Sequence, residues 1–225
     1  MKNRIYKIKN LILMCGILLL INIRCVELDE TAKDFTGPST FYNSKQQVES
    51  AFASAMQRLY SEWSAYSYGH WNFESDDQMY GGELVFGDDQ GSDLWGAHYR
   101  SIADLNPAIK ALNDDRLGTS VSQEEKDALM AQARFIRAFN YFSLVRLFGD
   151  VPLITEETNP VTDEITRTPT VDVYAFIEAD LLFAIQHLPD SWPGENQGRP
   201  SKGAAKVILA KVYITIATAP LNNTS

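Results

Sequence analysis

The sequence predicts an all-α fold built from stacked helical hairpins. Apolar residues recur every three or four positions in five separate segments, which is the spacing of an amphipathic helix. Two of these segments follow a capping-box pattern, in which a serine precedes a glutamine or glutamate by three residues. No segment shows the clear alternation expected of a strand, and the run 151–154 comes nearest to it.

The first two helices are predicted from their apolar stripes. Ser44 and Gln47 form the capping box of the first helix. Pro107 lies inside the second stripe, and we expect it to kink or split that helix, because proline cannot donate the helical hydrogen bond. The first stripe is Val48, Ala51, Phe52, Ala55, Met56, Leu59, Tyr60 and Trp63, and the second is Trp95, Tyr99, Ile102, Leu105, Ile109 and Leu112.

The third helix is unusual because arginines lie among apolar residues that cover most of its circumference. It begins at the capping box Ser122-Gln-Glu-Glu125, and Gly149 is placed to end it in a left-handed conformation. Its apolar residues are Leu129, Ala133, Phe135, Ile136, Phe139, Phe142, Val145 and Leu147, and its arginines include Arg134, Arg137 and Arg146. We expect Arg134 and Arg137 to be mostly buried and paired with carboxylates or helix-end carbonyls, since an unpaired buried charge is costly.

Two more helices complete the series. The fourth follows Thr170 and ends at Pro189, with Tyr174, Ile177, Leu181, Ala184 and Leu188 on its apolar face. The fifth runs from near Ser201 to Pro220 through Ala205, Ile208, Leu209, Val212 and Ile216. The third to fifth helices recur at similar intervals, which favours stacked hairpins that each need their neighbours to bury both faces.

The N-terminus has the pattern of a secretory signal peptide, predicted over residues 1–24. Four basic residues in the first nine precede an apolar run from Leu11 to Ile21, which is too short to span a bilayer comfortably. Cys25 lies just past this run, at the position where bacterial lipoproteins are lipidated. Arg24 fits a lipoprotein cleavage motif poorly, so ordinary cleavage and a soluble exported chain remain the alternative. Residues 25–43 are predicted to be a lipid anchor and tether.

The charge of the mature chain excludes some partners. The leader holds five of the 20 Lys and Arg residues and no acid, so 15 basic and 29 acidic residues remain, a net charge of −14. Such a chain repels nucleic acid and anionic head groups and is compatible with neutral, hydroxyl-rich ligands. Cys25 is the only cysteine left after the leader, so no disulfide is expected within the mature chain.

Candidate ligand-binding residues lie in the non-helical stretch from Ala65 to Gly91. It combines six aromatic and six acidic side chains and has no Lys or Arg. Aromatic faces cover the C–H surfaces of sugars, and carboxylates accept protons from their hydroxyls. The candidates are Trp71, Asp76, Asp77 and Tyr80, together with Trp95, although aromatic residues under a long loop also suit packing and Asp76-Asp77 also suits helix capping.

The sequence offers little for catalysis or metal binding. Asp76 and Asp77 are adjacent and tend to diverge, whereas glycosidases place two carboxyl groups about 5–9.5 Å apart. The stretch "DDQGSD" lacks the spacing of a calcium-binding EF-hand loop, and the three histidines show no zinc-ligand spacing. We therefore expect no enzyme activity, no cofactor and no metal.

Several motifs together resemble the RagB/SusD family. "AQARFIRAFNYFSLVRLFGDVPLIT" resembles the family's signature helix, and "TRTPTVDVYAFIEADLLFAIQHLP" and "GRPSKGAAKVILAKVYI" resemble the two helices after it. "CVELDE" resembles the family's start at a lipidated cysteine, and "ESDDQM" and "LWGAHYRSIADLN" resemble earlier family blocks. The resemblance covers nearly all of residues 25–219.

This resemblance implies a lipid-anchored, surface-exposed protein of the outer membrane that captures oligosaccharides or polysaccharides and delivers them to a TonB-dependent transporter. It implies tetratricopeptide-like helical hairpins with long irregular loops, and residues 44–225 as an N-terminal helical domain of a longer, SusD-like protein. The membrane attachment would be through the lipid alone. The alternatives are an exported helical-repeat adaptor for protein or peptide and, with less support, an all-α glycoside hydrolase. The sequence does not identify the glycan.

Overall fold

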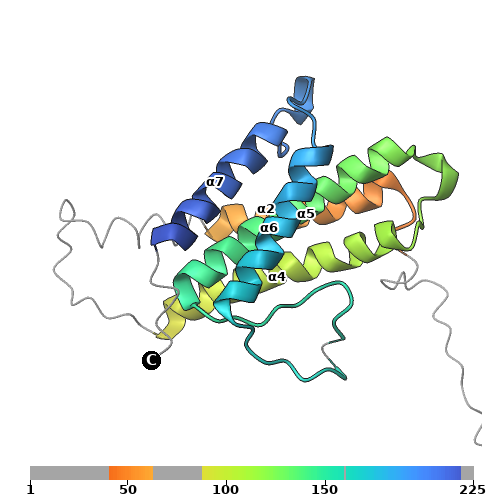
Figure 1. Ribbon diagram of the computed structural model, residues 1–225. Coiled ribbons are helices and arrows are strands. Elements are labelled where there is room, and N and C mark those ends of the chain that lie inside the picture. The colour runs from red at the N-terminus through yellow and green to blue at the C-terminus, as the bar shows by residue number, and fades with distance from the viewer. Residues whose placement is uncertain (1–40, 63–87, 160, 219–225) are drawn as a thin grey trace, which may run out of the picture. The chain divides into compact units, whose positions relative to one another are not determined.

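The computed structural model describes residues 41–62, 88–159 and 161–218 (Figure 1). Within these ranges the protein is helical and has no strand, which confirms the predicted all-α class. The helices are α2 (Lys45–Glu62), α4 (Asp88–Asn113), α5 (Gln123–Phe148), α6 (Thr170–His187) and α7 (Lys202–Thr218), with short 3₁₀ helices η2 (Gly118–Ser120) and η3 (Gly194–Asn196). No helix in these ranges is both long and apolar enough to cross a membrane.

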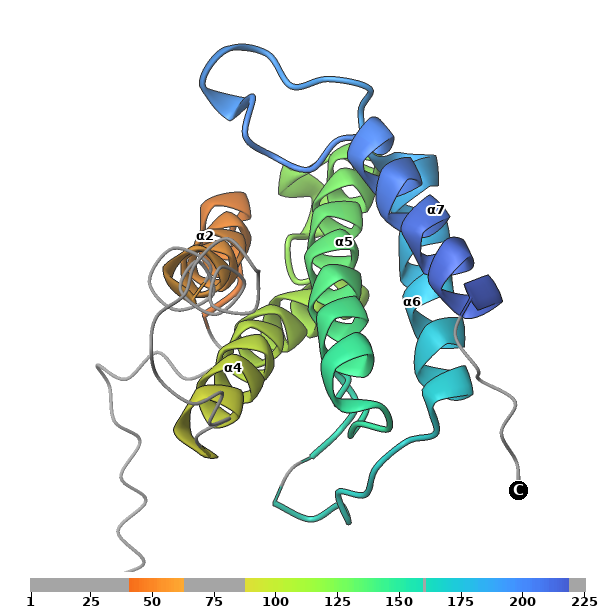
Figure 2. The same ribbon diagram turned by 90° about the vertical axis from the view of Figure 1, so that its left-hand side faces the viewer.

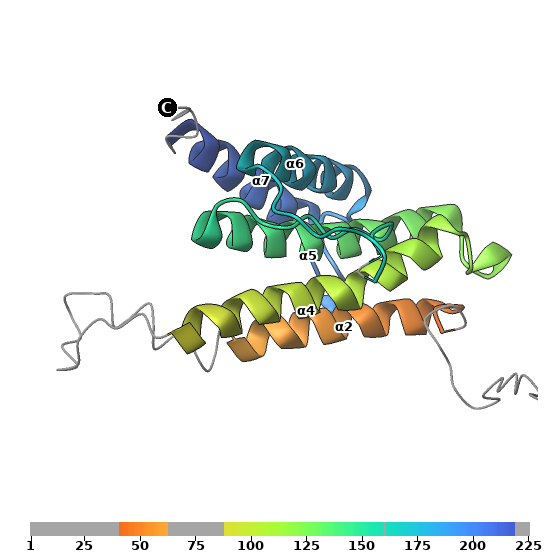
Figure 3. The same ribbon diagram turned by 90° about the horizontal axis from the view of Figure 1, so that it is seen from below.

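Consecutive helices lie side by side, and α5 occupies the middle of the arrangement. Figure 2 shows α2 and α4 on one side of α5, and α6 and α7 on the other, and Figure 3 shows the same order from below. The most extensive packing joins α5 to α6, α2 to α4, and α4 to α5. The central position of α5 explains why apolar residues cover most of its circumference.

Two apolar clusters bury α5 from opposite sides. On one side, the first half of α5 packs against α2 and the second half of α4 through Leu129, Met130, Ala133 and Ile136. On the other, the second half of α5 packs against α6 and α7 through Ala138, Tyr141, Phe142, Leu144 and Val145. A fully buried leucine-sized side chain contributes about 1.5–3 kcal/mol, so both clusters stabilise the position of this helix.

The predicted helix caps are present. At the start of α5, Ser122 Oγ accepts the Glu125 backbone N–H, and the Glu125 carboxylate accepts the Ser122 backbone N–H. At the start of α2, Ser44 Oγ accepts the Gln47 backbone N–H at 3.3 Å, while Gln47 reaches back one residue further, to the backbone N–H of Asn43. These bonds satisfy donors that a helix start leaves free.

The end of α5 differs from the prediction in one detail. Gly149 has a positive φ of 70°, as expected for a glycine at this position, but its ψ of −126° lies outside the left-handed helical region. The chain therefore leaves the helix at this residue. It continues into Val151, which is fully buried and forms an isolated antiparallel bridge with Thr168.

Other predictions need correction. Helix α4 runs continuously through Pro107 and is not split by it. It also begins at Asp88, so residues 88–91 of the predicted non-helical stretch are helical. Met56, Tyr60 and Leu147, placed on apolar stripes by their spacing, are 41%, 69% and 44% exposed and do not belong to the buried core.

The connection between α5 and α6 is held against the helices by hydrogen bonds. Tyr141 Oη donates to the carbonyl of Ile154 and accepts its backbone N–H, both at 2.7 Å. Tyr99 Oη donates to the carbonyl of Pro152 at 2.7 Å. At the other end, the Asp150 carboxylate accepts the backbone N–H and the hydroxyl of Thr170, which caps the start of α6 and lowers the pKa of Asp150.

Candidate functional site

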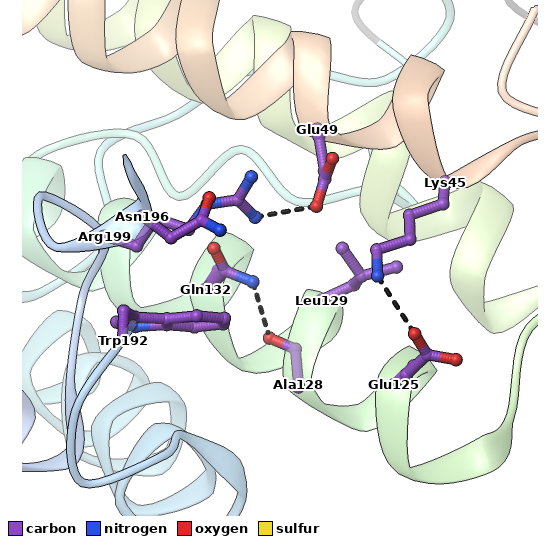
Figure 4. A pocket seen from close by; sticks show the side chains of 9 residues that line it. All are labelled: Lys45, Glu49, Glu125, Ala128, Leu129, Gln132, Trp192, Asn196 and Arg199. Atoms are coloured by element: carbon purple, nitrogen blue, oxygen red, sulfur yellow. Dashed lines mark hydrogen bonds and ion pairs between the residues drawn. The ribbon is translucent and has the colours of Figure 1, made fainter. Parts of the chain in front are cut away.

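A pocket of about 240 Å³ lies where α2, α5 and the connection between α6 and α7 meet (Figure 4). The first turns of α2 and the first half of α5 form two of its walls, and the connection covers it from a third side. Its lining residues are Lys45 and Glu49 from α2, Glu125, Ala128, Leu129 and Gln132 from α5, and Trp192, Asn196 and Arg199 from the connection.

Local bonds hold the connection in place above α5. Trp192 Nε1 donates to the carbonyl of Pro200 at 2.6 Å, which closes the turn that contains η3. The Trp192 side chain packs against the small cluster of Ala131, Ala184, Leu188 and Ala205. Arg199 Nη1 lies 2.7 Å from Glu49 Oε1 and joins the connection to α2 across 150 residues of sequence.

The polar groups of the pocket are fixed in different ways. Gln132 is 3% exposed, and its Nε2 donates to the carbonyl of Ala128 at 3.2 Å, which orients the side chain. At the far end, Lys45 Nζ lies 3.0 Å from Glu125 Oε1. This hydrogen bond, followed by those to Ser122, lowers the pKa of Glu125. The two cations and two carboxylates of the lining therefore form two ion pairs, and the pocket carries no net charge.

Trp95 is the one predicted ligand-binding residue that the structure describes. It lies near the start of α4, half-buried, with its ring centroid 5.1 Å from that of Phe148 in an edge-to-face arrangement and 4.9 Å from that of Tyr99. Its ring also packs against the second apolar cluster. These contacts account for its position without a ligand, and they leave part of the ring accessible.

The other predicted site residues lie outside the described residues. These are Trp71, Asp76, Asp77 and Tyr80, as well as the predicted lipidation site Cys25. Where the structure describes the chain, no group of three or more His, Cys, Asp or Glu side chains is arranged to hold a metal ion.

Sequence reasoning missed the pocket. Its residues come from three segments, and no spacing within one segment links Glu49 to Arg199. One signal was available, because Trp192 is a large aromatic residue in a connection rich in proline and glycine. Such a residue must pack on a neighbouring helix or contact a ligand, and Trp192 packs on the cluster described above.

Buried polar networks, in contrast, have structural roles. Arg137 is 2% exposed at its side chain, and it contacts the Asp180 carboxylate through two nitrogens, Nε at 2.8 Å and Nη2 at 3.0 Å. Its Nη1 lies 2.5 Å from Glu156 Oε2. Burial pushes the pKa of Glu156 upward, but Arg137, together with hydrogen bonds from the Glu156 backbone and Asn113, holds this pKa below its usual value. Burial raises the pKa of Asp180, and Arg137 opposes the rise.

The outcome for the other two arginines is mixed. The Arg134 side chain is about a quarter exposed, and its guanidinium carbon lies 4.3 Å from the ring centroid of Phe183. Its Nε lies 3.9 Å from Asp180 Oδ1 and is buried without a hydrogen bond. Arg146 is exposed on the outer face of α5, over the ring of Phe142. The expected burial therefore holds fully for Arg137 and partly for Arg134.

Comparison with known proteins places the chain among SusD-like proteins. Residues 27–214 match the SusD-like family described as "Starch-binding associating with outer membrane". SusD-like protein P2 of Formosa agariphila is 32% identical, with 88% of this chain and 42% of the relative covered. A SusD-like protein of Bacteroides ovatus is 31% identical, with 78% and 33% covered. The chain thus spans less than half the length of these two curated relatives.

Solved structures agree with this. A SusD homologue of Bacteroides thetaiotaomicron has a TM-score of 0.66 at 25% identity, with 83% of this chain and 39% of that chain covered. A laminarin-binding SusD-like protein has a TM-score of 0.52 at 33% identity, with 56% and 27% covered. Members of the family are carbohydrate-binding proteins rather than enzymes.

Proposed function

The chain belongs to the SusD-like family, as its motifs predicted, and we propose that it is a glycan-binding lipoprotein of the outer membrane that hands oligosaccharides to a TonB-dependent transporter. The observation that carries the proposal is the family match over residues 27–214, together with the laminarin-binding relative at 33% identity. A lipid on Cys25 would supply the membrane attachment, because buried acyl chains contribute about 0.8 kcal/mol per CH₂.

The proposed ligand contacts are Trp71, Asp76, Asp77 and Tyr80, with Trp95 at the start of α4. The segment that holds the first four is rich in aromatic and acidic residues and has no basic residue. Stacking on an aromatic face and hydrogen bonds to carboxylates suit a neutral polyol and need no metal. We expect weak binding, since sugar hydroxyls lose water as they gain protein partners.

The test is calorimetric titration of the full-length protein with a panel of soluble polysaccharides that includes laminarin and starch. The parent is expected to bind at least one of them. The Trp71→Ala variant is expected to bind the same glycan about two- to tenfold more weakly, the equivalent of about 0.5–1.5 kcal/mol for one aromatic contact.

Circular dichroism of the variant must show an unchanged helical signal, so that a loss of binding reflects the contact and not the fold. A folded Trp71→Ala variant with parental affinity would refute the role of this residue. A parent that binds no glycan in the panel, but captures peptides, would refute the glycan-binding function and favour the adaptor alternative. Release of shorter saccharides by the parent would favour a glycoside hydrolase.

A further inference from the structure

We propose that the pocket between α2, α5 and the connection from α6 to α7 is a second saccharide-contact site, which holds one neutral sugar ring against Trp192. This inference rests on the proposed function, because it takes the ligand class from it. It concerns residues that are distinct from the predicted contacts at Trp71, Asp76, Asp77, Tyr80 and Trp95.

The Trp192 ring is held by the fold and is partly exposed. The side chain packs on the small alanine and leucine cluster between α5, α6 and α7, so it is supported from within the fold. On the side toward Arg199, the guanidinium carbon lies 5.5 Å from the ring centroid. This guanidinium lies over the ring, and the Trp192 side chain is only partly buried, so part of the indole is accessible beside the contact. An indole held in this way suits stacking with the C–H face of a sugar.

Polar side chains with unused hydrogen-bonding groups lie beside the ring. The amide of Gln132 is fixed by its bond to Ala128, and its Oε1 accepts no hydrogen bond from a described residue. Figure 4 shows this oxygen on the side of Asn196 and Arg199. The side-chain amide of Asn196 makes no hydrogen bond with another described residue either. The site thus offers acceptors and donors together, which is what hydroxyl groups require.

The charges of the pocket lining balance one another. Each cation in the lining is paired with a carboxylate, Arg199 with Glu49 and Lys45 with Glu125. A charged ligand would have to break one of these pairs, whereas a neutral sugar can share their remaining donors and acceptors. The pairing therefore favours a neutral ligand over phosphate, sulfate or an acidic sugar.

The size of the pocket suits a small ligand. The pocket volume of about 240 Å³ is below the range of about 300–1,000 Å³ that is usual for drug-sized ligands. It fits one sugar ring and not a longer oligosaccharide. A single ring makes few contacts, so the site by itself is expected to bind weakly. It would strengthen binding of a long glycan that also contacts the protein elsewhere, because the second contact is then intramolecular.

The test uses saturation-transfer NMR on the full-length protein, with the methyl glycosides of glucose, galactose, mannose and xylose as monosaccharide probes. The parent is expected to contact at least one probe. Trp192→Ala should weaken this contact about two- to tenfold through loss of stacking. Because Trp192→Ala also removes packing, Gln132→Met serves as a second variant. It keeps the volume and removes the acceptor, and it should weaken the contact about fivefold, as expected for one hydrogen bond.

Gln123→Met is the matched control, because it makes the same change on the exposed surface of the same helix and outside the pocket. It should retain the parental signal, whereas Trp71→Ala should retain only the part of the signal that comes from the pocket. Pocket variants that contact the probes as the parent does would overturn this inference and leave the proposed function standing. Loss of all probe contact in Trp71→Ala would also overturn it. A parent that binds neither probes nor polysaccharides would overturn both.

Discussion

Replacing Arg137 by alanine should destabilise the protein strongly, because the guanidinium is the shared partner of two carboxylates. Arg137 and Asp180 are 2% and 3% exposed at their side chains, and Glu156 is 13% exposed. Arg137→Ala leaves the Asp180 carboxylate buried without its main partner, and breaking a buried ion pair typically costs about 3–5 kcal/mol. At about 2–4 °C per kcal/mol for a chain of this size, the melting temperature should fall by about 6 to 20 °C.

The assay is urea unfolding followed by circular dichroism, with Arg146→Ala as the matched control. Arg146 lies on the same helix but is exposed, and it makes no ion pair with a described residue. Its removal should change the free energy of unfolding by no more than about 0.5 kcal/mol. If Arg137→Ala and Arg146→Ala unfold at the same urea concentration, the buried network does not contribute as the structure indicates.

A double variant and a pH series sharpen the result. Arg137→Met combined with Asp180→Leu should recover much of the loss, because apolar residues of similar volume often replace a buried pair without cost. In Arg137→Ala, burial raises the pKa of Asp180 without opposition from the guanidinium. A carboxyl with a raised pKa in the folded state favours folding as it is protonated. The deficit relative to the parent should therefore shrink as the pH falls from 7 toward about 4.

Two further predictions concern His98 and Cys25. His98 is buried, with its Nδ1 2.9 Å from Asn140 Oδ1, and burial lowers its pKa. The unfolded state therefore takes up a proton more readily than the folded state, and stability should be lost as the pH falls below about 6.5. Urea midpoints between pH 8 and 5 check this, and a His98→Gln variant with the same pH slope as the parent would contradict it. Cys25→Ala should release the chain from the outer-membrane fraction, and a variant that stays as firmly bound as the parent would exclude lipidation at this residue.

The three arginines of α5 show how far the sequence predicts burial. The apolar pattern correctly indicates a helix covered on most sides, but it does not show which arginine faces a partner. A helix turns by about 100° per residue, so Arg146, nine residues after Arg137, lies on the opposite face. Arg134, three residues before Arg137, lies about 60° away, which agrees with its partial burial. Once α6 covers the face of α5 that carries Arg137, the angular position of each arginine around the helix explains how deeply it is buried.

The partners themselves depend on tertiary structure. Asp180 is 43 residues from Arg137 in the sequence, and Glu156 lies in an irregular connection without periodicity. The helix caps at Ser44 and Ser122 were predictable because both partners lie within a few residues. The exposure of Met56 and Tyr60 was not, since apolar spacing indicates a possible interface but does not show which neighbours are present. The pocket could not be predicted for the same reason, because its walls come from three separate segments.

The distribution of polar contacts separates the parts of the chain that hold the fold from those that are free to bind. Two buried polar residues of α5 are committed to neighbouring elements, Arg137 to α6 and to the connection after α5, and Asn140 to α4. The unused hydrogen-bonding groups beside Trp192 belong to Asn196 in the connection between α6 and α7 and to Gln132 on α5. Connections carry binding residues more readily than buried helices, because their side chains can change without loss of the core. Variants of Arg137 should therefore alter stability at unchanged glycan affinity, whereas variants of Asn196, an exposed residue of the connection, should alter affinity at nearly unchanged stability.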